Sequence, residues 1–131
     1  MTNTQTGGCH CGKVKLSFPG ESTFSFSCHC GTCQKLVSGG RLLGFGVAEE
    51  GVSVDGETSE YRYAGGSGKD IVLSFCPACS TQLFAKPTAM EGAIVIRANA
   101  LENPNSFTPE KFVFTDEACS WDNTPSESAA S

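Results

Sequence analysis

Apolar and polar residues alternate in short stretches along most of this chain. The clearest stretches are residues 14–18, 24–28 and 71–75, in which valine, leucine, isoleucine, phenylalanine or cysteine occupies every second position. Because successive side chains of a β-strand point to opposite faces of a sheet, this period of two predicts strands with one buried face. The same pattern, bounded by glycine, proline, asparagine and serine, predicts further strands at residues 42–47, 52–54, 60–64, 82–85, 93–97 and 112–114.

A helical period of three to four residues does not extend over ten or more residues anywhere in the sequence. Residues 33–39, CQKLVSG, form one helical turn at most. Fifteen glycines and six prolines, together with 39% hydrophobic residues, are typical of a turn-rich β protein. We therefore predict a mainly β fold, built as an antiparallel β-sandwich or open barrel.

The length of 131 residues predicts a single domain. We place this domain at residues 7–122, after an N-terminal extension of residues 1–6. Residues 123–131, NTPSESAAS, are small and polar, which predicts a disordered tail. The glycine-rich stretch GGSGKD at residues 65–70 lacks the spacing of a phosphate-binding loop, so we predict a hairpin loop there.

The net charge of −5 and the pI near 4.9 argue against nucleic acids and anionic membranes, which bind clustered Lys and Arg. The first residues, MTNTQTGG, have neither a basic start nor an apolar run, and no later stretch approaches the roughly 18 apolar residues of a membrane span. We therefore expect no nucleic-acid partner, no membrane partner and a cytoplasmic location. In a reducing cytoplasm, clustered cysteines indicate metal binding or catalysis rather than disulfides.

Eight cysteines are more than a core of this size needs. Seven of them form three groups: CHC at residues 9–11, CHCGTC at residues 28–33 and CPAC at residues 76–79. A Cys-x2-Cys turn brings two sulfurs to one metal ion, and in a strand the cysteines of Cys-x-Cys face the same side. Disulfides are an alternative, but the number of clustered cysteines is odd. An iron–sulfur cluster is another alternative, although Cys-x-Cys pairs in a β fold favour zinc.

Two pairs and one trio of cysteines suggest two zinc sites. The two pairs can complete a closed tetrahedral site of the structural kind, with the ligands Cys9, Cys11, Cys76 and Cys79. The trio leaves a fourth position for a substrate, as catalytic zinc sites do, and consists of Cys28, Cys30 and Cys33. Spacing alone also allows the trio to take Cys119 or a histidine as its fourth ligand.

Three further residues stand next to these motifs. His10 and His29 each lie between two cysteines, so in extended backbone their side chains point away from the sulfurs. We predict that such histidines support the loops by hydrogen bonding. Cys119, near Trp121, is predicted to be a free thiol that is buried or half-exposed.

The combined motifs resemble the glutathione-dependent formaldehyde-activating enzyme family, which also includes centromere protein V. The matching stretches are GGCHCGKV (7–14), CHCGTCQK (28–35), FCPACSTQLF (75–84), LENP (101–104) and Trp121. They extend over about residues 7–122, which is nearly the whole chain. The sequence departs from the family pattern at Ser80, where glycine is usual, at Lys111, where histidine is common, and at Cys119, where proline is often seen. It also lacks the arginine often found just before Phe75 and Cys76.

The resemblance implies a β-tent fold of antiparallel sheets, with a structural zinc on the two cysteine pairs and a second zinc on the trio. It implies that the trio's zinc supports the type reaction of the family, which joins formaldehyde to glutathione as S-(hydroxymethyl)glutathione. The expected function is therefore that of a zinc-dependent carbon–sulfur lyase, with two Zn²⁺ ions as cofactors and a small thiol such as glutathione as substrate.

Three thiolates make a zinc ion electron-rich, which favours sulfur chemistry over the activation of water. Because these thiolates add negative charge, an anionic thiol needs nearby cations, and Lys35 and Arg41 are the nearest by sequence. We expect Lys35 to steer the carboxylates of the thiol, and Gln34 to hydrogen-bond to them or to the carbonyl oxygen. The alternative function is a zinc-binding module that binds a thiol or a protein partner without turnover.

Overall fold

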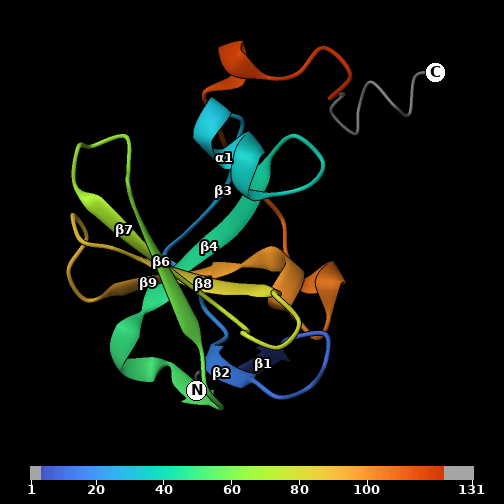
Figure 1. The fold of residues 1–131 in the computed structure, drawn as a ribbon, viewed down its shortest axis with the longest axis vertical. Helices are drawn as coiled ribbons and strands as arrows, with labels where there is room; N and C mark the ends of the chain where they lie inside the picture. Colours follow the sequence, from blue (N-terminus) through green and yellow to red (C-terminus); the bar gives the residue numbers. More distant parts are fainter. Residues whose placement is uncertain (1–3, 123–131) are drawn as a thin grey trace.

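The computed structural model of the protein describes residues 4–122, which form ten β-strands and one short α-helix (Figure 1). In chain order the elements are β1 (Thr4–Gly8), β2 (Lys15–Pro19), β3 (Phe24–Cys28), α1 (Gly31–Leu36), β4 (Leu42–Ala48), β5 (Ser53–Asp55), β6 (Ser59–Ala64), β7 (Asp70–Phe75), β8 (Gln82–Pro87), β9 (Ala93–Arg97) and β10 (Lys111–Val113). The predicted disordered tail at residues 123–131 lies outside the described residues.

The prediction of a mainly β fold is confirmed, and every stretch that the alternation marked overlaps an observed strand. The strands form two open sheets, a three-stranded sheet in the order β1-β2-β5 and a seven-stranded sheet in the order β10-β3-β4-β9-β8-β7-β6. All strand pairs are antiparallel except β10 and β3, which run parallel. The predicted hairpin loop at residues 65–70 connects the antiparallel strands β6 and β7.

Strand β1 was not predicted, because its sequence TQTGG has no apolar alternation. The strand forms because β2 pairs with it in antiparallel register, from Thr4 opposite Pro19 to Gly8 opposite Lys15. Gly7 also forms a bridge to Leu101, and a Cβ at Gly7 would lie 2.2 Å from the carbonyl oxygen of Ala100. A glycine is therefore required where this strand meets the segment after β9.

Helix α1 begins earlier than expected. The sequence predicted a turn after Cys33, whereas the helix starts at Gly31 and contains Cys33. Its N-cap is Cys30, whose sulfur accepts a hydrogen bond from the backbone N–H of Cys33 at 3.4 Å. A sulfur therefore has the role that an oxygen of Ser, Thr, Asp or Asn usually has at a helix N-terminus, and for this reason the usual N-cap signals missed it.

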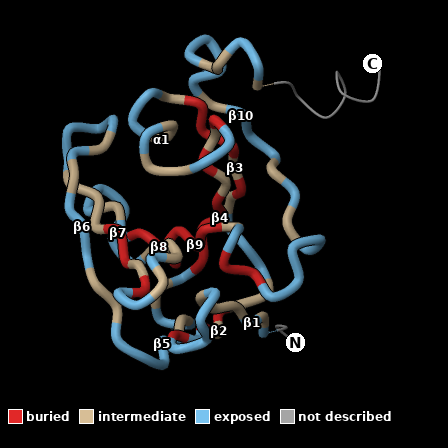
Figure 2. Tube along the Cα trace, turned by 45° about the vertical axis from the view of Figure 1, so that its right-hand side comes forward, coloured by how far each residue is buried: buried red, intermediate tan, exposed pale blue. Residues whose placement is uncertain are grey.

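The main hydrophobic core joins the inner faces of the two sheets. Leu16 and Phe18 of β2 pack with residues of β4, β8 and β9, and the rings of Phe18 and Phe45 lie 5.6 Å apart. Figure 2 shows the buried parts of the chain along β3, β4, β8 and β9. Because side chains alternate along β9, Ile94 and Ile96 enter this core, while the intervening residues face the opposite side of the sheet.

The cysteine-rich helix lies at one end of the molecule. In Figure 1, α1 and the segment after β10 lie together at the top, and β1 and β2 lie at the opposite end. No helix within residues 4–122 has the length and apolar character needed to cross a membrane.

Candidate metal centres

The first group of cysteines brings together two remote turns of the chain. Cys9 and Cys11 lie between β1 and β2, and Cys76 and Cys79 lie between β7 and β8. Their four sulfur atoms lie within 4.8 Å of one another. A metal ion bound there would cross-link the small sheet to the large one.

The distances within this group fit a tetrahedral metal site. The sulfur of Cys11 lies 3.6 Å from that of Cys9 and 3.7 Å from that of Cys76. Sulfurs at about 2.3 Å from a zinc ion in a tetrahedron are about 3.8 Å apart. A disulfide would require about 2.05 Å, so these pairs have the spacing of ligands and not of a covalent bond.

Hydrogen bonds hold these sulfurs in place. The N–H of Val14 donates to the Cys9 sulfur at 3.2 Å, and the Thr81 hydroxyl lies 3.2 Å from the Cys79 sulfur. The hydroxyl and backbone of Thr81 lower the pKa of Cys79 to about 5. The same hydroxyl accepts the backbone N–H of His10 at 3.1 Å. These contacts favour the thiolate form, which is the form that binds metal ions.

The second group consists of Cys28, Cys30 and Cys33. Cys28 is the last residue of β3, Cys30 caps α1, and Cys33 lies in the first turn of that helix. The sulfurs of Cys28 and Cys30 are 3.5 Å apart, and all three lie within 4.8 Å of one another. The strand end and the helix start therefore place three sulfurs around one point.

Without a cation, this trio does not hold three thiolates at neutral pH. The hydrogen bond from Cys33 lowers the pKa of Cys28 to about 6, although burial opposes this shift. The same contact, with burial, raises the pKa of Cys33 far above its ordinary value. One sulfur keeps its proton because neighbouring thiolates repel each other. Since a divalent cation removes this repulsion, the donor set and its spacing fit zinc.

The trio has no fourth protein ligand among the described residues. The group of possible ligand atoms around it contains neither Cys119 nor a histidine. Instead, the trio lines a cavity of about 490 Å³. Apolar side chains from β3, β4, β7, β9 and β10 form much of its wall, namely Phe26, Leu42, Ile71, Val95 and Val113.

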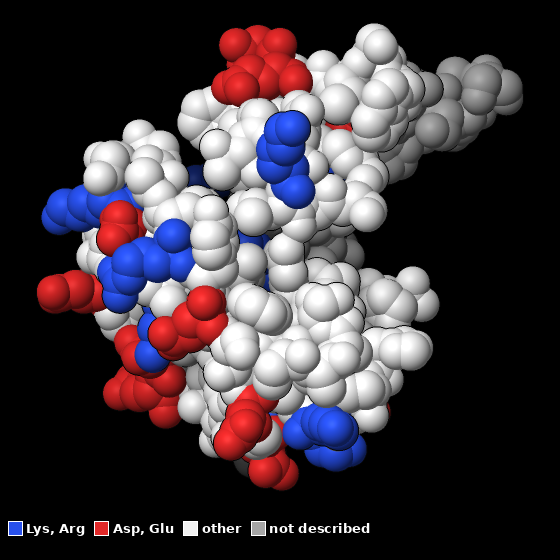
Figure 3. Space-filling view, viewed as in Figure 1, with Lys and Arg blue, Asp and Glu red and all other residues white. Residues whose placement is uncertain are grey.

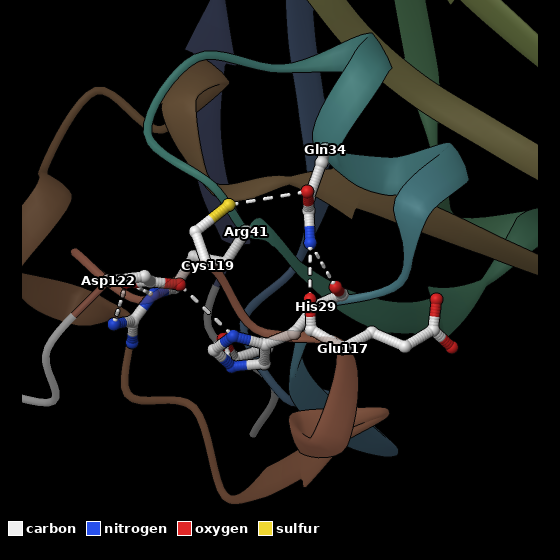
Figure 4. A network of polar contacts seen from close by, with 7 residues as sticks. His29, Gln34, Arg41, Glu117, Cys119 and Asp122 are labelled. Atoms are coloured by element: carbon white, nitrogen blue, oxygen red, sulfur yellow. Dashed lines mark hydrogen bonds and ion pairs between the residues drawn. The ribbon is translucent and has the colours of Figure 1, made fainter.

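Gln34 joins the trio loop to the segment after β10 (Figure 4). Its amide nitrogen donates to the carbonyl oxygens of His29 at 2.7 Å and of Glu117 at 2.8 Å. Its amide oxygen accepts a hydrogen bond from the Cys119 sulfur at 3.3 Å. Gln34 thus acts as a clamp across two segments that are remote in the sequence, a role that sequence reasoning missed.

His29 is buried and forms a second connection to the same segment. Its Nδ1 lies 3.1 Å from Asp122, and its Nε2 lies 3.1 Å from the hydroxyl of Ser27. Asp122 also pairs with Arg41 (Figure 4). The order Ser27, His29, Asp122 resembles a hydrolytic triad, but Ser27 is fully buried and has no access to a substrate. The prediction that His29 supports the loop by hydrogen bonding is confirmed.

The remaining predicted site residues lie outside the cavity wall. Lys35 is exposed on α1, and neither Gln34 nor Lys35 is among the described residues that line the cavity of the trio. Arg41 is paired with Asp122. Cys119 is partly exposed, as predicted, and its thiol contacts Gln34.

The polar residues of the cavity that were not predicted include Tyr63 of β6 and Arg97 of β9. Both belong to strands that the alternation predicted, and Arg97 follows the apolar run AIVI. Because side chains alternate along a strand, Arg97 at the end of β9 lies on the same face as Val95. This spacing was the sequence signal that the cation faces a buried space.

Comparison with known proteins gives a family for this chain. The sequence model of the family described as glutathione-dependent formaldehyde-activating enzyme matches residues 4–117. The chain belongs to this family. No curated protein matches it. Membership of the glutathione-dependent formaldehyde-activating enzyme family indicates activity on formaldehyde and glutathione, and the two cysteine groups are consistent with zinc.

The fold of this family member also occurs in a Rhodobacter sphaeroides protein of known crystal structure. The two share 18% sequence identity with a TM-score of 0.61, and the alignment covers 82% of this chain and 99% of the other. At this identity the similarity concerns the fold alone.

Proposed function

We propose that this chain is a zinc-dependent carbon–sulfur lyase-type enzyme that forms S-(hydroxymethyl)glutathione from glutathione and formaldehyde. The observation that carries the proposal is the cysteine trio. Cys28, Cys30 and Cys33 have ligand spacing, they lack a fourth protein ligand among residues 4–122, and they line a cavity large enough for a small molecule.

Two zinc ions are part of this proposal. Cys9, Cys11, Cys76 and Cys79 would hold the structural ion, and the trio would hold the second. A zinc ion bound to the trio supplies Lewis acidity that favours the thiolate form of a thiol substrate. The family match and the two cysteine groups support this assignment.

The proposed reaction forms one carbon–sulfur bond. The sulfur of glutathione adds to the carbon of formaldehyde, the electron pair of the C=O bond moves to oxygen, and this oxygen takes up the proton that the thiol has lost. All atoms of both reactants remain in the product, so no oxidant or reductant is needed. The protein would hold the two reactants together and exclude bulk water.

Tyr63 is the hydroxyl group that we expect to face the reacting oxygen. It lines the cavity of the trio. Burial raises the pKa of Tyr63, and the nearby Arg97 only partly opposes this shift. The hydroxyl is therefore protonated at neutral pH and is able to donate a hydrogen bond to the oxygen as negative charge develops there.

The predicted contacts of Gln34 and Lys35 with the thiol remain predictions. The hydrogen bonds of Gln34 favour a different role for this residue. We further propose that the protein works in the cytoplasm, because a reducing compartment keeps its free cysteines available for metal.

Native mass spectrometry and exchange NMR test this function together. We expect two zinc ions per wild-type chain, one per Cys30→Ser chain, and two per Cys119→Ser chain, the matched control because Cys119 belongs to neither group. Wild type and Cys119→Ser should accelerate exchange between glutathione and S-(hydroxymethyl)glutathione in the presence of formaldehyde, whereas Cys30→Ser should not.

Two other results would refute the proposal in different ways. A zinc-replete wild type that holds only one ion would contradict the second metal site. A protein with two ions that binds glutathione without accelerating the exchange would instead be a thiol-binding module, which is the alternative function given by the sequence.

A further inference from the structure

Arg97 is a buried cation in the wall of the cavity that the trio lines. Only 3% of the residue is exposed, and it ends β9 on the same face as Val95, which also lines the cavity. A buried guanidinium normally has an acidic partner, because an unpaired charge is costly to remove from water. Among the described residues no carboxylate forms an ion pair with Arg97.

Gln82 and Tyr63 contact this guanidinium, and one of its nitrogens has no partner among residues 4–122. Its Nε donates to the side-chain oxygen of Gln82 at 3.2 Å, and Gln82 in turn donates to the carbonyl oxygen of Leu36, at the end of α1. Its Nη2 is buried and has no hydrogen-bond partner among residues 4–122. The arginine is thus held in position with a free donor, which is how a protein prepares a site for an anion.

The strand next to this arginine has a glycine beside the cavity wall. Gly44 of β4 stands opposite Arg97 in the strand register. A Cβ at Gly44 would lie 3.0 Å from a side-chain carbon of Val95 and 3.4 Å from the ring of Phe26, and both of these residues line the cavity. A larger residue at position 44 would therefore press on the cavity wall beside the guanidinium.

The face drawn in Figure 3 has no cluster of basic side chains that could bind an anion in place of Arg97. There, Lys and Arg lie among Asp and Glu and do not gather into one basic patch. Among residues 4–122, Glu117 is the one other charged residue besides the cysteines that lines the cavity, and it is exposed. An anionic ligand of the cavity would find its positive partner in Arg97.

We propose that Arg97 binds a carboxylate group of the molecule that occupies the cavity of the trio, and that it thereby selects anionic thiols over neutral ones. The inference rests on the proposed function in one respect, that a thiol is the natural occupant. A guanidinium binds a carboxylate through charge-assisted and often paired hydrogen bonds, and a lysine lacks this fork geometry.

Calorimetry on the zinc-loaded protein tests the inference with two ligands that lack a free thiol. The ligands are S-methylglutathione, which carries both carboxylates, and its diethyl ester, which carries none. We expect wild type to bind the acid at least 10-fold more tightly than the ester. Arg97→Gln should weaken binding of the acid by about 10- to 100-fold and change binding of the ester by less than 3-fold, and Arg97→Lys should fall in between.

Arg62→Gln is the matched control, because Arg62 lies on β6 with 62% of its side chain exposed and pairs with Asp70. This variant has the same net charge as Arg97→Gln and should bind both ligands as wild type does. Zinc content and circular dichroism establish that each variant is folded. If Arg97→Gln does not fold, the comparison of acid with ester on wild type and Arg97→Lys still decides the question.

Equal affinity of wild type for acid and ester would overturn the inference. An equal loss of affinity for both ligands in Arg97→Gln would also overturn it, because the arginine would then support the metal site or the packing of the cavity. The proposed reaction fails separately if the acid binds through Arg97 while the exchange of glutathione with formaldehyde is not accelerated. Acceleration without any preference for the acid would leave the reaction in place and remove the role of Arg97.

Discussion

The clamp formed by Gln34 leads to a prediction that separates two roles for this residue. The sequence suggested that Gln34 contacts the substrate, whereas in the structure its amide joins the backbone of His29 and Glu117 and the thiol of Cys119. Replacement by alanine removes all three hydrogen bonds without altering the cavity wall, since Gln34 does not line the cavity. If the clamp is the role of Gln34, the variant loses stability more than substrate affinity.

The size of the loss follows from the surroundings of each bond. A hydrogen bond between neutral groups contributes about 1 kcal/mol. The bonds to His29 and Cys119 are partly buried, while the bond to Glu117 is exposed, so water replaces that one at little cost. We expect Gln34→Ala to lose about 2 kcal/mol, which lowers Tm by about 6–10 °C in a domain of this size. Gln34→Glu should lose more, because a carboxylate places an acceptor against two carbonyl oxygens.

Differential scanning fluorimetry with saturating zinc measures these shifts, and the rate of the glutathione exchange gives KM in the same samples. Lys35→Ala is the matched control, since this neighbouring residue of α1 is exposed, and it should change Tm by no more than about 2 °C. A normal Tm with a strongly raised KM in Gln34→Ala would refute the clamp and support a substrate contact. Equal destabilisation by Gln34→Ala and Lys35→Ala would also contradict it.

Three further predictions concern packing, pH and backbone conformation. Gly7→Ala should lower the free energy of unfolding by about 2 kcal/mol or more, because its Cβ would lie 2.2 Å from the Ala100 carbonyl oxygen. Gly66→Ala is the control, since a Cβ there meets nothing within 4 Å. If chemical denaturation shows that Gly7→Ala is as stable as wild type, the close approach is contradicted. Burial by itself would raise the pKa of Asp122, but Arg41 and His29 hold it below its ordinary value, so its stabilising effect is fully present above about pH 4 and is lost as pH falls through the folded-state pKa. The Tm difference between wild type and Asp122→Asn should therefore be constant from pH 7 to 5 and shrink only below about pH 4; a difference that disappears between pH 7 and 5 would assign the effect to another group. Ser80 has a φ of 67°, so Ser80→Val should be about 1–2 kcal/mol less stable than Ser80→Gly by denaturant unfolding, and equal stability of the two would argue against left-handed backbone there.

Most of the strands could be predicted from the sequence because a strand with one buried face requires a period of two, whatever its neighbours are. The spacing within each cysteine motif was equally local, since it places the sulfurs of that motif near one point, whereas the meeting of the two remote pairs depends on the fold. Residues 9–11 and 76–79 come together in the structure, apart from residues 28–33. The cysteine spacing thus suggested the same two groups that the structure shows.

Features that depend on contacts between remote segments required the tertiary structure. The polar strand β1 exists because β2 and Leu101 pair with it, and β10 pairs in parallel with β3, which lies far away in the sequence. Sequence distance suggested Gln34 as a substrate contact, which remains a prediction, and only the structure shows its hydrogen bonds to the segment after β10. Arg97, 64 positions after Cys33 in the sequence, shares its cavity. The sequence by itself determined most of the strands and the three cysteine motifs, because these depend on spacing along the chain. Only the tertiary structure decided that Arg97 lies in the cavity of the trio and that Gln34 bonds to the segment after β10, because contacts between distant segments set these neighbours.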